Sequence, residues 1–504
     1  MNVFPMWFLP GLLSLTCVLS AAGLDTPPGI AGPFVQFLGP PIAVKAQVSG
    51  RFLLAANPVR GLQILEISRP DHPMLVAELP TAGSIQAIHV LSDSLAAVIF
   101  EVSSYSSRLA VVRFAETPEI IATLDLPGRS EASQLSGNML HVALREHVPM
   151  GNFAGRWLLV TLNMLRPSAP RIAASLPLAL ASAPVVRLTP GFAFIPNSDG
   201  LHVIPLSAAS PRISVAATIP LAGPVIQAPG AIEQQDGMLR FATDKYVPPA
   251  EEARPYVGHF ELAMEVWSLA DPLPVRLGSW SEERESETYK VKIDGDRFWA
   301  RRGYLLALVD FKNPASPAAA REVTLRDGFF DFLPLGDRFL LLGYTGGKIT
   351  CDLFDLDFFA NSPARPIARF QRATTPDIGG VYPTLTSENV FMLGRQRLIR
   401  IPFSVTGTDA QPSAKGTAFL EVRRNQLVSR GTTPTTVSLG TLLPYGTRLL
   451  TLTSAQYRSF SVPGIGRPRL RSILTVGPPG IIQFGFGFSP VTEPMPIVTP
   501  NSSF

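Results

Sequence analysis

Cysteine is scarce in this chain of 504 residues, which contains only Cys17 and Cys351. Because Cys17 lies in the apolar first segment, a chain processed after Ala22 keeps only Cys351 and can form no internal disulfide. The residues before Cys17 are not the small ones that lipid attachment requires, which argues against a lipoprotein. Cys351 is therefore expected to pack as a small apolar side chain.

Charge and catalytic motifs are also sparse. Charged residues make up 16% of the chain and the net charge is +4, far from the clustered basic surface of a nucleic-acid binder. The sequence contains no phosphate-binding Gly-x-x-x-x-Gly-Lys, no dinucleotide fingerprint, no Gly-x-Ser-x-Gly and no paired zinc-binding histidines on a helix. It therefore predicts no catalytic residue, no cofactor, no metal ligand and no nucleic-acid partner.

Amphipathic helical spacing is missing, and turn-forming residues are abundant instead. The 49 prolines and 40 glycines are distributed between short apolar runs, which favours many short strands. These runs recur in groups of four, as at 43–48, 51–56, 61–67 and 73–79, and the third and fourth members reappear at 157–162 with 169–176. About nine units of roughly 40 to 50 residues can be delimited, a period typical of propeller blades.

The repeat predicts an all-β fold, a single β-propeller of four-stranded antiparallel blades that extends from 35 to 488. Radial stacking lets each sheet bury the faces of its neighbours and leaves only short edges. The units at 223–287 and 372–436 are stretched, so we expect about eight blades, within a range of seven to nine. The alternating run 481–488 either pairs with the first blade and locks the ring or forms an ordinary edge strand. An insertion is expected at 244–261 and a disordered polar tail at 489–504.

The first segment, 1–22, contains no charged residue and ends on the small residues Ser20, Ala21 and Ala22. This pattern predicts a signal peptide, and hence a protein that is exported to the periplasm, the cell surface or the medium. The alternative is an uncleaved membrane anchor, although Pro5 and Pro10 would interrupt its helix. Contact with a membrane is expected only through this segment.

Several segments of the sequence, in this order, resemble a family of secreted bacterial β-propeller proteins. The members of that family have C-terminal propeller domains that are distantly related to WD-type repeats. The segments are 288–298, Arg301-Arg302, 308–314, 335–343 and 352–356, within a region of about 231–370. The resemblance implies a propeller and an exported location. It implies no activity and supplies no catalytic residue.

Arg301 and Arg302 are the candidate binding residues, because two adjacent arginines between apolar strands cannot both be buried without partners. Alternation along a strand would send their side chains to opposite faces. The alternative is a purely structural role, an ion pair with an aspartate of a neighbouring blade. Weaker candidates are a cation site at Asp352, Asp355 and Asp357 and a histidine pair of His141 and His147.

Three classes of function remain open at this stage. The favoured one is a monomeric, non-enzymatic scaffold of the bacterial cell envelope that binds a protein or a cell-surface ligand, because the chain combines a rigid repeat with no catalytic motif. The alternatives are an enzyme whose site is assembled at the central channel from several blades, and a sensor of a small ligand or cation.

Overall fold

The computed structural model describes residues 37–38, 45–58, 60–146, 157–178, 186–197, 199–226, 231–249, 258–271, 273–285, 288, 290–325, 328–345, 348–359, 366–373, 390–393, 396–405, 414–423, 426–435, 441–453, 455–462, 468–476 and 481–482. The chain divides into two compact units, and every blade lies within one of them, Leu38–Ile481.

Nine four-stranded antiparallel sheets, each made of four consecutive strands, form the blades of a β-propeller. Blades 1 to 3 are β2 (Ala46–Ser49), β3 (Phe52–Asn57), β4 (Gly61–Glu66) and β5 (Met74–Leu79); β6 (Ile85–Val90), β7 (Leu95–Ser103), β8 (Ser106–Arg113) and β9 (Glu119–Leu126); and β10 (Arg129–Ser136), β11 (Met139–Arg145), β12 (Trp157–Asn163) and β13 (Arg171–Leu178). Blades 4 to 6 are β14 (Arg187–Thr189), β15 (Phe192–Asn197), β16 (Gly200–Pro205) and β17 (Ala217–Ile219); β18 (Ile232–Gln235), β19 (Met238–Val247), β20 (His259–Ser268) and β21 (Val275–Arg284); and β22 (Lys290–Asp294), β23 (Arg297–Arg302), β24 (Leu305–Asp310) and β25 (Arg321–Thr324). Blades 7 to 9 are β26 (Phe329–Pro334), β27 (Arg338–Thr345), β28 (Lys348–Asp355) and β29 (Ala368–Ala373); β30 (Val390–Leu393), β31 (Gln396–Val405), β32 (Ala414–Arg423) and β33 (Gln426–Thr435); and β34 (Thr441–Tyr445), β35 (Arg448–Leu452), β36 (Gln456–Ser461) and β37 (Arg469–Thr475).

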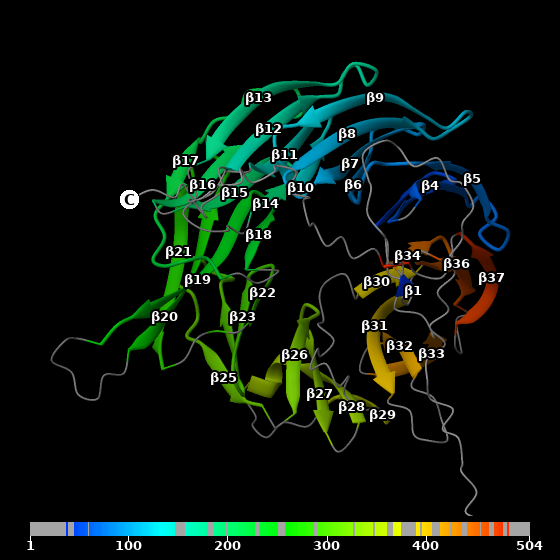
Figure 1. Cartoon of the computed structure of the whole chain (residues 1–504). Coiled ribbons are helices and arrows are strands. Elements are labelled where there is room, and N and C mark those ends of the chain that lie inside the picture. The colour runs from blue at the N-terminus through cyan, green and yellow to red at the C-terminus, as the bar shows by residue number, and fades with distance from the viewer. Residues whose placement is uncertain are drawn as a thin grey trace, which may run out of the picture. The chain divides into compact units, whose positions relative to one another are not determined.

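The position of a strand within its blade follows from its apolar pattern. Second and third strands such as β3 and β4 are buried almost throughout, whereas fourth strands such as β5 and β37 expose much of their length. First strands contact one another around the ring: β2 with β6, β6 with β10, β10 with β14, β22 with β26 and β30 with β34. The first strands therefore form the inner wall and the fourth strands the outer rim, with the blades in chain order (Figure 1).

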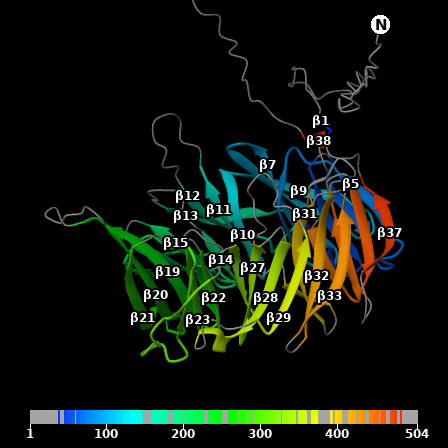
Figure 2. The same cartoon turned by 90° about the horizontal axis from the view of Figure 1, so that it is seen from below.

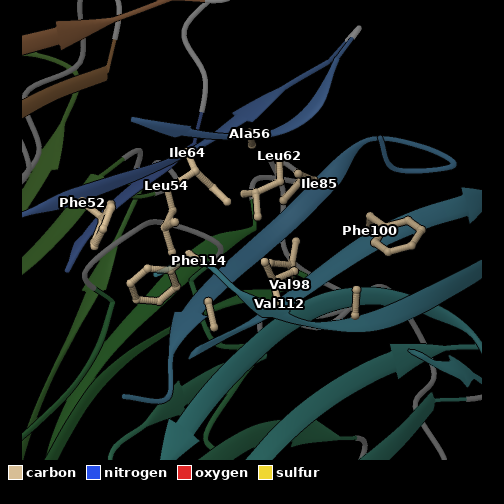
Figure 3. Packing of buried hydrophobic residues seen from close by; sticks show 12 residues of the cluster. Phe52, Leu54, Ala56, Leu62, Ile64, Ile85, Val98, Phe100, Val112 and Phe114 are labelled. Atoms are coloured by element: carbon tan, nitrogen blue, oxygen red, sulfur yellow. The ribbon is translucent and has the colours of Figure 1, made fainter. Parts of the chain in front are cut away.

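Buried apolar side chains form nine clusters among the described residues, and each cluster joins two neighbouring blades. Between blades 1 and 2, Leu54 and Ile64 pack toward Val98, and other members of the same cluster complete the interface (Figure 3). The Phe52 and Phe114 rings meet edge to face with their centroids 5.6 Å apart, a favourable geometry for aromatic pairs. Stacking between blades thus buries the faces that a lone sheet would leave in water.

The ring closes between blade 9 and blade 1, where one of the nine clusters brings Leu53 and Leu65 against Leu450 and Tyr457. Figure 2 shows β5 and β37 next to each other at this seam. Both blades are complete sheets of consecutive strands, so the seam contains no exchanged strand among the described residues. Among the described residues of blades 1 and 9, side-chain contacts join the two sheets.

The blade number, predicted as about eight within a range of seven to nine, is nine. The two stretched units are single blades whose strands are long: β19, β20 and β21 have 10 residues each, as do β31, β32 and β33. In the described parts of these two units, longer hairpins and not additional strands therefore obscured the count.

Ile481 and Ile482, the described residues of the expected locking strand at 481–488, are not part of blade 1. These two residues form β38 (Ile481–Ile482), which pairs with β1 (Phe37–Leu38) in a separate two-stranded sheet.

The predicted insertion at 244–261 begins and ends inside β19 and β20, whose pairing continues to Val247 and His259. The predicted signal 1–22, the tail 489–504 and the centre of the insertion at 250–257 lie outside the described residues. No helix in the described part of the chain is long and apolar enough to span a membrane.

Candidate functional site on the inner wall

In each blade, one residue of the first strand pairs with the third residue of the second strand. The residue at this position is polar in six successive blades. In blades 1 to 6 this residue is Gln47, His89, Gln134, Arg187, Glu233 and Lys292. In blades 7 to 9 it is Leu333, Phe391 and Leu443. Polar groups are therefore concentrated on one arc of the inner wall.

In blades 2 and 3 the polar position makes a Ser–His contact. The Nε2 atom of His89 lies 2.7 Å from Oγ of Ser133. Burial lowers the pKa of His89 to about 4, so the ring is neutral at pH 7. A base this weak cannot efficiently remove the proton of a serine hydroxyl, so this pair serves as a contact between blades and is a poor nucleophilic dyad.

In blade 5 the polar position belongs to a charge network that reaches blade 6. The Arg240 side chain is almost completely buried, and its Nη2 donates to Asp296 Oδ1 at 2.8 Å. Its Nη1 lies 3.8 Å from Glu233 Oε2. Burial raises the pKa of Glu233, while Arg240 opposes that shift. Two carboxylates accompany this one guanidinium, and the Arg240–Asp296 contact links blades 5 and 6.

Blade 6 carries a different arrangement, which we call the inner cationic cluster: Lys290, Lys292 and Arg301. Lys290 pairs directly with Arg301 across β22 and β23, and Lys292 is two residues along from Lys290. Side chains of directly paired residues, and of residues two apart, project from the same face of a sheet. All three cations therefore project toward β26 of blade 7.

The inner cationic cluster contacts blade 7, where its two lysines meet at one carboxylate. Asp331 Oδ1 lies 2.9 Å from Nζ of Lys290 and 3.1 Å from Nζ of Lys292. Arg301 donates from Nη2 to the Phe329 carbonyl at 3.0 Å, and Lys292 also donates to the Phe332 carbonyl. The cluster thus contacts Phe329, Asp331 and Phe332 of β26, and both lysines meet at the Asp331 carboxylate.

Burial gives the cluster its electrostatic character. The Asp331 and Lys292 side chains are 1% and 11% exposed, whereas Lys290 is 24% exposed and faces water more openly. The Lys292 ammonium lies 4.8 Å from the centroid of the Phe332 ring. Desolvation lowers the pKa of Lys292 to about 8, Asp331 opposes the shift and Lys290 adds to it. A lysine perturbed in this way on an inner wall is a candidate for function.

The structure places the two arginines that were selected from the sequence on opposite faces of blade 6. Arg301 joins the inner cationic cluster, and its described partners are carbonyl oxygens of Gly303 and Phe329. Arg302 ends β23 opposite Leu305, on the other face of the sheet by alternation. A binding role for either residue stays a prediction. Sequence reasoning missed Lys290 and Lys292, although two lysines alternating in a predicted inner strand were a usable signal.

The weaker sequence candidates do not assemble into a site. Asp352 accepts two hydrogen bonds of 2.7 Å from Arg369, and β28 ends at Asp355. The 3-10 helix η1 (Leu356–Phe359) follows, so strand alternation does not continue to Asp357. No group of three or more His, Cys, Asp or Glu residues in the described ranges could hold a metal ion.

His141 and Cys351 are buried inside blades. The Nδ1 atom of His141 lies 2.9 Å from Oγ1 of Thr161, while His147 lies outside the described residues. Cys351 is 0% exposed, and burial raises the pKa of its thiol. It packs between blades 7 and 8 as the small apolar side chain that the sequence predicted.

Comparison with known proteins gives structural likeness alone. No family model and no curated protein matches the chain. Among solved structures, Hsv2 of Kluyveromyces lactis with its complete loop 6CD is 10% identical with a TM-score of 0.36, covering 78% of this chain and 98% of that one. Apo AztD of Citrobacter koseri is 12% identical with a TM-score of 0.33, covering 73% and 94%. The dihydro-heme d1 dehydrogenase NirN is 14% identical with a TM-score of 0.37, covering 66% and 67%. All three TM-scores are below 0.5, so the β-propeller fold of this chain rests on its own nine sheets and not on these similarities.

Proposed function

We propose that this propeller is a non-enzymatic binding scaffold that holds an anionic group of its ligand at the inner cationic cluster. The observation that carries the proposal is that Lys290 and Lys292 meet at the Asp331 carboxylate while Arg301 projects from the same face of blade 6. Hydrogen bonds from ammonium and guanidinium groups to oxyanions are short and strong, and a guanidinium adds directional donors.

The inner-wall location supports this proposal. The cluster lies on the polar arc, because the equivalent register position is also polar in blades 1 to 5. A ligand with an anionic group matches the cations of blade 6, and anionic polymers or lipids of a cell surface belong to that class.

Replacing Arg301 with methionine is expected to weaken the binding of inorganic phosphate about 10-fold, the loss of about 1.4 kcal/mol that one charged hydrogen bond contributes. Methionine retains the apolar stem of the side chain and removes only the charge. Isothermal titration with phosphate at low ionic strength measures the affinity.

Arg302→Met is the matched control, because Arg302 is adjacent in sequence but projects from the opposite face of blade 6. This variant is expected to bind phosphate as the unaltered protein does. Equal losses of affinity in the two variants, or an unchanged phosphate affinity in Arg301→Met, would refute an anion site at the inner cationic cluster.

We also propose that the protein is exported, as the bacterial propeller family that it resembles implies. The support is the uncharged apolar segment 1–22, which ends on small residues suited to cleavage after Ala22. Mass spectrometry of the native protein is expected to find a mature chain that begins near Gly23. Recovery of the protein from the cytoplasm with Met1 retained would contradict export.

A further inference from the structure

Lys292 combines three properties of an amine that can react with a carbonyl group. It lies on the inner wall, its ammonium faces the Phe332 ring, and the Asp331 carboxylate is 3.1 Å from Nζ. Its pKa of about 8 leaves roughly a tenth of the amine neutral at pH 7, against about one in 2500 for an ordinary lysine. Only the neutral amine is a nucleophile.

We propose that Lys292 binds the carbonyl group of a small anionic aldehyde or keto acid as an imine. This inference rests on the proposed function, because Lys290 and Arg301 would hold the anionic group of the same ligand. Their side chains project from the same face of blade 6 as Lys292. The ligand class is therefore a carbonyl compound whose carboxylate or phosphate lies a few bonds from the carbonyl carbon.

The reaction balances with the groups at hand. The neutral Nζ attacks the carbonyl carbon, and Asp331 carries one proton from nitrogen to oxygen, which gives the carbinolamine. Asp331 then carries the second nitrogen proton to the hydroxyl group, which leaves as water while the carbon–nitrogen double bond forms. One carbonyl and one amine thus yield one imine and one water, with no oxidant or reductant.

Reductive trapping tests this inference on the full-length protein. Glyoxylate serves as the anionic aldehyde, acetaldehyde as the neutral one, and cyanoborohydride reduces any imine to a stable secondary amine at pH 7. Peptide mass spectrometry then locates the modified lysines. We expect glyoxylate to modify Lys292 at least 10-fold faster than Lys312, which is exposed in the turn after β24.

Two variants make the outcome specific. Lys292→Arg is expected to abolish the fast modification, and Arg301→Met to slow it about 10-fold with glyoxylate while leaving acetaldehyde unaffected. Modification that simply follows solvent exposure, with Lys312 faster than Lys292, would overturn the inference. Slow trapping at Lys292 in a protein that still binds phosphate through Arg301 would overturn the imine and retain the anion site. Fast trapping by both aldehydes, independent of Arg301, would support a reactive Lys292 and overturn the anion site.

Discussion

Tyr457→Ala is expected to lower the free energy of unfolding by about 4 kcal/mol, because it opens a large cavity at the seam of the ring. Tyr457 is 0% exposed and packs between blades 9 and 1, and its hydroxyl donates to the Pro70 carbonyl at 3.2 Å. Tyr457→Phe removes only that hydrogen bond and should cost about 1 kcal/mol. Urea denaturation monitored by tryptophan fluorescence measures both losses.

Tyr304→Ala serves as the control, since Tyr304 is 57% exposed, and we expect it to change stability by less than about 0.5 kcal/mol. The seam also contains a bidentate ion pair, in which Arg448 donates to both carboxylate oxygens of Asp71 at 3.0 and 2.7 Å. Ser459 donates to the same carboxylate at 3.1 Å. Similar small losses in Tyr457→Ala and Tyr304→Ala would mean that the seam is not closed as described.

Gly278→Ala is expected to destabilise the protein by about 3 kcal/mol, because blades 5 and 6 approach each other there without room for a side chain. A Cβ atom on Gly278 would lie 1.5 Å from the carbonyl oxygen of Pro314, in the turn before β25. Since the obstructing atom belongs to the backbone, the turn itself must move. The melting temperature and the urea midpoint should both fall.

Gly237→Ala, in the same blade, separates this clash from the general cost of replacing glycine. Gly237 has a φ of 72°, and an added Cβ would meet nothing within 4 Å. Only backbone strain of about 1 kcal/mol is therefore expected. If Gly278→Ala were as mild as Gly237→Ala, the close approach of the Pro314 turn to β21 would be wrong.

The sequence predicted the fold class because the local signals agree with one another. In blade 1 the runs at 51–56 and 61–67 became β3 and β4, with polar turns between them, and both are buried as their apolar composition requires. Such a pattern depends on strand length and turn residues, which are local properties. The number of blades was harder to predict, because long hairpins such as β19–β20 resemble an insertion when only sequence spacing is considered.

The candidate site was predicted only in part. Arg301 was selected because of the unusual Arg301-Arg302 pair, but nothing in the linear sequence places Arg301 beside Lys290 and Lys292. That neighbourhood requires the register of β22 against β23, which sets Lys290 opposite Arg301. The carboxylate that both lysines contact, Asp331, comes from the next blade and is 39 residues beyond Lys292.

By itself, the sequence determined that this chain folds as four-stranded β units around a ring, because the alternation of apolar runs and turns is encoded locally in each unit. The tertiary structure alone decided that there are nine blades and that side chains close the seam. It also decided which polar residues meet on the inner wall. The physical reason is that these properties depend on contacts between blades, and the energy of burying Tyr457 or Lys292 is set by neighbours distant in the chain.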